Sequence, residues 1–98
     1  MLLNGEGRPD ITATSTTQLI TFDKSGANSL SVDVEGTPSV YVLVNISEAD
    51  FDTAYAAGKA IKVRSGIPFG FYGDQYVNLK SVCFRTASTD SVVNFGAY

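Results

Sequence analysis

The chain has 98 residues, a length that fits a single domain. Its 7 basic and 10 acidic residues give a net charge of −3, and only 17% of its residues are charged. The basic residues form no run, which argues against nucleic-acid binding because that requires a basic surface facing the phosphates. No stretch reaches the roughly 18–20 apolar residues of a membrane span, and the N-terminus has no secretory signal. We therefore expect a protein made in the cytoplasm that contacts neither nucleic acid nor membrane.

The first ten residues contain glycine and proline without apolar periodicity. We interpret residues 1–10 as an N-terminal arm and residues 11–98 as one domain. Two interpretations of the arm stay open. It is either a frayed terminus or a segment that docks on a neighbouring subunit, in which case Leu2 and Leu3 are candidate interface residues.

From residue 11 onward the chain is rich in β-branched residues, and turn signals divide it about every 8–12 residues. This pattern is typical of an all-β protein. We predict about eight short strands in a small antiparallel β-sandwich or jelly roll, with the strand order left open between a jelly roll and an immunoglobulin-like arrangement. The predicted strands are 11–14, 18–22, 30–34, 40–46, 60–64, 67–72, 77–86 and 92–95.

Three of these strands carry specific information about burial. In 30–34 apolar and polar residues alternate, which predicts one buried face. In 40–46 the residues Tyr41 and Leu43 make the second face apolar as well, so this strand lies centrally or meets a partner. Phe69 and Phe71 are interpreted as core residues, although the neighbouring proline and glycine favour an edge strand or a bulge.

One short helical turn is expected near residues 48–57. Ser47 is a suitable N-cap, Gly58 is a suitable terminator, and Phe51, Ala54 and Tyr55 have the i, i+3, i+4 spacing of a helix face. A long ordered loop is the alternative for this segment.

Catalysis is not expected. The chain has no histidine, and its single cysteine, Cys83, lies between apolar residues of a strand, where a core or interface thiol is the natural interpretation. Glu48, Asp50 and Asp52 do not follow the pattern of a calcium loop and are better explained as charges at a helix N-terminus. No glycine-rich phosphate motif occurs. We therefore predict no cofactor and no metal site.

The tyrosines are the candidates for an interaction surface, because tyrosine combines an apolar ring with a polar hydroxyl. Tyr72 and Tyr76 flank a polar loop, Tyr98 is the last residue, and Tyr41 lies on the second face of its strand. Exposed tyrosine is common at protein interfaces. We therefore name Tyr41, Tyr72, Tyr76 and Tyr98 as candidate interface residues.

Four stretches in order are VLVNISEADFD (42–52), AIKVRSGIPFGF (60–71), SVCFR (81–85) and VVNFG (92–96). This order resembles small β-sandwich virion proteins of tailed bacteriophages over residues 38–98. The resemblance implies a structural subunit of the virion, such as a capsid decoration, head-fibre, neck or tail accessory protein. Its implied partners are further copies of itself and larger virion proteins, and its implied location is the virion.

A carbohydrate-binding module is the alternative function. Tyr72, Tyr76, Asp74 and Gln75 would then form a stacking and hydrogen-bonding platform, although the chain has no tryptophan, the usual stacking residue. The two functions can overlap, since a decoration protein can touch host glycans.

Overall fold

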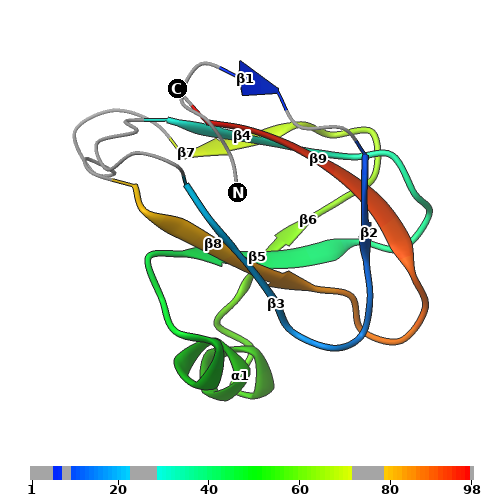
Figure 1. Ribbon diagram of the computed structural model, residues 1–98. Helices are drawn as coiled ribbons and strands as arrows, with labels where there is room; N and C mark the ends of the chain where they lie inside the picture. Colours follow the sequence, from blue (N-terminus) through cyan, green and yellow to red (C-terminus); the bar gives the residue numbers. More distant parts are fainter. Residues whose placement is uncertain (1–5, 8–9, 23–28, 72–78, 98) are drawn as a thin grey trace.

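The computed structural model describes residues 6–7, 10–22, 29–71 and 79–97. Two antiparallel sheets and one helix form three layers, with the helix outermost (Figure 1). The first sheet contains β1 (Glu6–Gly7), β2 (Ile11–Ala13), β9 (Ser91–Ala97), β4 (Leu30–Val34) and β7 (Phe69–Phe71). The second sheet contains β3 (Gln18–Thr21), β8 (Ser81–Arg85), β5 (Val40–Val44) and β6 (Ile61–Val63). The helix is α1 (Glu48–Ala56).

The strand pairing decides between the two arrangements that the sequence left open. Strand β2 pairs with β9, β3 with β8, β4 with β7, and β5 with β6, all antiparallel. Early strands thus pair with late ones in nested order, as in a long antiparallel ribbon rolled into two layers. Contacts of β4 with β9 and of β5 with β8 join these pairs into the two sheets. The fold is a jelly roll, which confirms the predicted all-β sandwich.

The main core lies between the two sheets, and alternation along the strands explains which side chains enter it. The apolar residues of β4 are buried, as the alternation in 30–34 predicted. Val40 and Val42 of β5 enter the same core from the opposite sheet. The aromatic rings of Phe84 and Phe95 meet across the layers with centroids 5.0 Å apart. The buried core cluster consists of Ala13, Phe22, Leu30, Val32, Val34, Val40, Val42, Val63, Phe71, Leu79, Val82, Phe84, Val93 and Phe95.

The helix forms where the sequence predicts it, because both of its ends are capped. The Ser47 hydroxyl accepts a hydrogen bond from the Asp50 amide at 3.1 Å, and Glu48 and Asp50 place negative charge in the first turn. At the other end, Gly58 has φ of 74°, its amide donates to Tyr55, and the Lys59 amide donates to Ala54. These two bonds form a Schellman motif, which needs a residue that tolerates positive φ. Across the described residues, no helix is long and apolar enough to cross a membrane.

The structure corrects two burial predictions. Phe69 is 36% exposed because β7 is an edge strand, so the interpretation of Phe69 as a core residue is wrong, whereas Phe71 is buried. Regular alternation along the expected strand 77–86 would place Leu79 on the same face as Cys83, away from the other sheet, but Leu79 lies in the core between the sheets. Regular pairing of β8 begins only at Ser81, so the alternation does not continue back to Leu79.

The chain ends also differ from the prediction. Strand β9 is longer than the expected 92–95, because β1 and β2 pair with successive parts of it on one side and β4 on the other. Residues 6–7 of the expected arm form β1, paired with Gly96 and Ala97 of the same chain. Residues 1–5 lie outside the described part.

A β-bulge follows β4. The amides of Glu35 and Gly36 both donate to the Val92 carbonyl, at 2.8 and 3.2 Å, so two residues oppose one. A Cβ on Gly36 would lie 2.6 Å from the Val92 amide nitrogen and against the Ser91 hydroxyl. The Ser91 hydroxyl is itself held by donation to the Pro38 carbonyl at 2.8 Å.

We therefore expect Gly36→Ala to lower the free energy of unfolding by about 1–3 kcal/mol, because backbone atoms must move to admit the methyl group. Urea denaturation measures the loss. Thr37→Ala, at the exposed neighbouring residue, is the control and is expected to change stability by less than about 0.5 kcal/mol. Equal stability of the Gly36 variant and the wild type would contradict the bulge geometry.

Candidate interaction surfaces

The sequence-predicted interface residues fall largely in parts of the chain that the structure leaves undescribed. Leu2, Leu3, Tyr72, Tyr76 and Tyr98 lie outside the described residues. The same holds for Asp74 and Gln75, which the carbohydrate-binding alternative requires. Of the predicted interface residues, Tyr41 alone lies in the described part of the chain.

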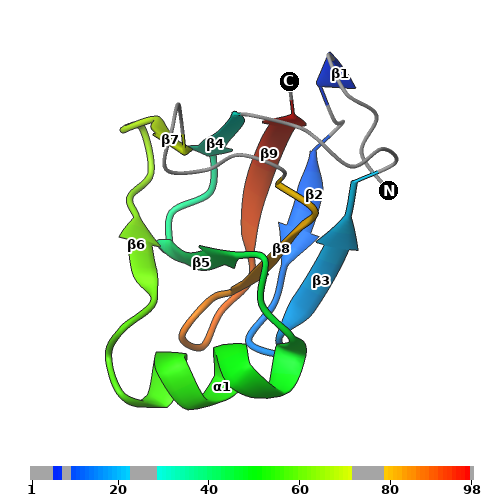
Figure 2. The ribbon, with the colours of Figure 1, turned by 90° about the vertical axis from the view of Figure 1, so that its left-hand side faces the viewer.

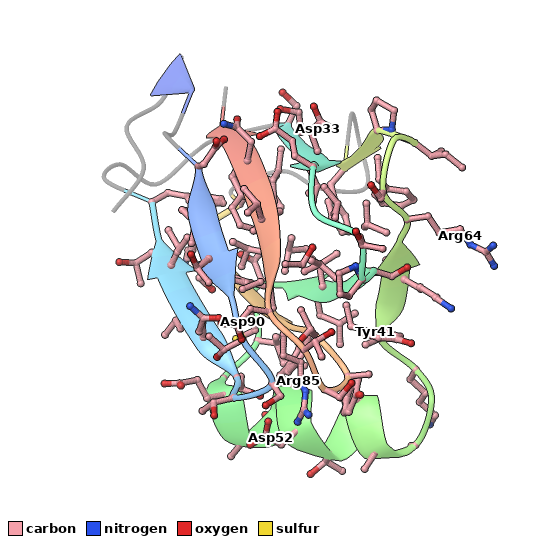
Figure 3. All side chains as sticks on the ribbon, turned by 90° about the vertical axis from the view of Figure 1, so that its right-hand side faces the viewer. Asp33, Tyr41, Asp52, Arg64, Arg85 and Asp90 are labelled. Carbon is pink, nitrogen blue, oxygen red and sulfur yellow. The ribbon has the colours of Figure 1, made fainter. Side chains whose placement is uncertain are left out.

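Tyr41 lies between the second sheet and the helix. Its ring meets Tyr55 of α1 edge-on, with centroids 5.1 Å apart, and Tyr55 in turn stacks on Phe51. The Arg85 guanidinium lies 4.1 Å from the centre of the Tyr55 ring, a cation–π contact. Figure 3 shows Tyr41 and Arg85 on the sheet above the helix. The apolar second face of β5 is thus covered by the helix of the same chain, and Tyr41 is half-buried.

Cys83 lies beneath the helix on the same face of the sheet. Its thiol is fully buried and donates to the Ile46 carbonyl at 3.3 Å. Burial, together with the nearby carboxylates of Glu48 and Asp52, raises the pKa of the Cys83 thiol to about 11. Each of these causes disfavours the thiolate, which is the reactive form.

We expect native Cys83 to react with an alkylating reagent at pH 8 at least a hundredfold more slowly than the unfolded chain. At that pH a thiol with pKa about 11 is only about 0.1% ionised, against about a quarter for an ordinary cysteine. Mass spectrometry of samples quenched over time measures the two rates, with and without denaturant. Equal rates would show that the thiol is open to solvent.

The outer face of the first sheet carries a group of carboxylates. Asp10, Asp33 and Glu35 face one another there, and the Asn94 side-chain amide donates to Asp10 at 3.4 Å. A hydrogen bond with Asp10 and then the charge of Asp10 raise the pKa of Glu35, with smaller contributions from desolvation and from Asp33. At neutral pH these negative charges repel one another in the folded state.

We expect Glu35→Gln to raise the melting temperature at pH 7 and to change it little near pH 4. A raised folded-state pKa means that the protonated carboxyl favours the fold at low pH, and this stabilisation is lost as pH rises through the folded pKa. The neutral amide does not lose it. Thermal unfolding followed by circular dichroism from pH 4 to pH 8 tests this, and a difference that does not vary with pH would contradict it.

Exposed apolar side chains mark two opposite sides of the jelly roll. On one side β6 and β7 are the edge strands of their sheets, and on the other side lies the edge strand β3 (Figure 2). Ile67 is 62% exposed and Phe69 is 36% exposed on the first side, while Leu19 of β3 is 41% exposed on the second. The sequence alone did not single out Leu19 or Ile67 as exposed residues. Pro68, next to Ile67, favoured an edge strand or a bulge for residues 67–72.

The first side is basic, and we call Lys62, Arg64, Ile67 and Phe69 the basic edge. Lys62 and Arg64 are exposed, and Arg64 points away from the molecule in Figure 3. No acidic residue occurs from residue 53 to residue 73. Neither Lys62 nor Arg64 forms an ion pair with any described residue.

A tight turn fixes the geometry of the basic edge. The Ile67 amide donates to the Arg64 carbonyl at 3.2 Å, and Gly66 has φ of 78°, as the third residue of a type II turn requires. The Gly66 amide also donates to the Val34 carbonyl at the end of β4. The turn is therefore held against the sandwich, and its exposed side chains project from a defined backbone.

The second side is acidic, and we call Leu19, Glu48 and Asp52 the acidic edge. Leu19 is paired in register with Cys83, and the Cys83 thiol donates to the carbonyl of Ile46, two residues before Glu48, so the start of the helix lies beside β3. The Thr17 hydroxyl donates to Asp52, which joins the helix to the edge of the sheet. Glu48 and Asp52 are both exposed.

Comparison with known proteins supports the fold. No family model matches the chain, and no curated protein sequence matches it. Among solved structures, the crystal structure of PirA is similar, with a TM-score of 0.55 over 94% of this chain and 93% of that chain, at 7% sequence identity. At this identity the likeness concerns the fold alone: the two chains share the arrangement of a small β-sandwich over nearly their full lengths.

Proposed function

We propose that this chain is a structural subunit of a bacteriophage virion, a capsid-surface (decoration or head accessory) protein, and that it packs with copies of itself and with larger virion proteins. The observation that carries the proposal is the exposure of Leu19 and Phe69 on edge strands and of Ile67 in the turn between the edge strands β6 and β7. Natural sheets usually protect their edges from other chains, and exposed aromatic and aliphatic side chains at such positions favour protein contact.

The fold and the resemblance add to this observation. Jelly rolls are frequent in viral capsid proteins, although the same fold serves lectins and other proteins, so the surface carries more weight than the fold. The order of motifs over residues 38–98 resembles small virion proteins of tailed phages. Packing on neighbours also suits a chain of 98 residues, since a core of this size leaves much apolar surface exposed to water.

Particle association tests the function. Particles purified on a density gradient from lysates of cells that express the chain are analysed by quantitative mass spectrometry. The chain is expected to band with the particles in a constant ratio to the major capsid protein. Its presence only in the soluble fraction would contradict the proposal, and binding to an array of glycans would then favour the carbohydrate-binding alternative.

A further inference from the structure

We propose that the basic edge of one copy docks on the acidic edge of the next, so that the chain assembles head to tail. This inference rests on the proposed function, because it names the surface through which copies pack. The two edges carry opposite charge, and each has exposed apolar side chains beside its charges. Interfaces combine these two features, with apolar contact supplying affinity and charge selecting the partner.

The positions of the two edges support a head-to-tail contact. In the second sheet, with order β3-β8-β5-β6, the acidic edge lies at β3 and the basic edge begins at β6, so the two lie at opposite ends of one sheet. Figure 2 shows the same arrangement, with β6 and β3 on opposite sides and α1 running between them. A molecule with complementary surfaces on opposite sides binds its own kind in a chain or a closed ring.

A symmetric dimer through either edge is disfavoured by charge. Two basic edges facing each other would bring Lys62 and Arg64 of both copies together, and two acidic edges would oppose Glu48 and Asp52. Like charges across an interface are unfavourable, whereas the head-to-tail contact places each charge opposite its complement.

Charges beside an edge strand have a second explanation, which the experiment must distinguish from recognition of a partner. Lysine and arginine beside an open strand also prevent unspecific strand pairing, and that role requires charge of either sign. Replacing Arg64 by Glu keeps a charge at this place and reverses only its sign. The variant therefore distinguishes protection of the edge from recognition of an acidic partner.

The test is the mass of the purified full chain by light scattering, over a dilution series up to about millimolar concentration. Wild-type protein is expected to associate, and to do so less as salt is added. Arg64→Glu and Glu48→Lys should each raise the dissociation constant at least about tenfold. The double variant, which exchanges the two signs, should restore association to within about threefold of the wild type.

Matched controls account for net charge. Lys80→Glu changes net charge as Arg64→Glu does, and Asp33→Lys changes it as Glu48→Lys does, at exposed positions outside both edges. Both controls should associate like the wild type. Circular dichroism confirms that each variant is folded, and Leu19→Ser, which leaves all charges unchanged, should also weaken association.

Two results would overturn the inference. The first is a wild type that stays monomeric throughout, and the second is an associating wild type that Arg64→Glu weakens no more than Lys80→Glu does. Neither result decides the proposed function, because a chain that bands with particles would still be a virion subunit whose contacts lie on another surface. A chain that associates through these edges but is absent from particles would contradict the proposed function alone.

Discussion

Replacing Phe84 by alanine is expected to lower the free energy of unfolding by about 3–5 kcal/mol. Phe84 is 1% exposed on β8, which lies between β3 and β5, and its ring meets Phe95 of the opposite sheet. The substitution removes apolar contact from the place where the two layers touch and leaves a cavity that surrounding strands cannot fill. Since the free energy of unfolding of a small domain is only about 5–15 kcal/mol, this loss removes a large part of the stability.

Urea denaturation of wild type and variant measures this loss. Phe69→Ala is the matched control, because it removes the same atoms from an edge strand where the ring is 36% exposed. We expect the control to lose only about 1 kcal/mol. Similar losses for the two variants would mean that the Phe84 ring is not at the centre of the core.

Phe51→Ala is expected to cost about 3 kcal/mol and to loosen the helix from the sheet. Of the residues of α1, all of which the structure describes, Phe51 alone is buried. A helix of nine residues is not stable by itself in water, so it depends on its contact with the sheet. Without the Phe51 ring the helix will open more often and expose Cys83 beneath it.

Alkylation of Cys83 at pH 8 reports this opening. The Phe51 variant should react at least about tenfold faster than the wild type, which corresponds to about 1.4 kcal/mol in the opening equilibrium. Phe71→Ala is the control, because Phe71 is buried in the other sheet, away from the helix. If the two variants have similar global stability, Cys83 in Phe71→Ala should be alkylated more slowly than in Phe51→Ala. Equal alkylation rates in the two variants would exclude local opening of the helix.

The surfaces proposed for contact between copies differ from the interface residues that the sequence indicated. Tyr41 was a candidate interface residue because β5 is apolar on both faces, but helix α1 covers that face. Leu19, Ile67 and Phe69 became visible as surface residues only in the fold. Alternation within a strand tells which side chains share a face, yet it does not tell whether the strand has a neighbour on each side.

Local signals determined the elements of this protein. The alternation in 30–34 predicted its buried face, and Ser47 with Gly58 predicted both ends of α1, because capping and pleating depend on residues close in sequence. The tertiary structure alone decided the nested pairing of early with late strands, the cover over Tyr41 and Cys83, and the edge positions of β3 and β6, whereas Pro68 and Gly70 already favoured an edge strand or a bulge at β7. These features depend on pairing between residues far apart in the chain, and short-range periodicity carries no information about which distant strand a given strand will meet.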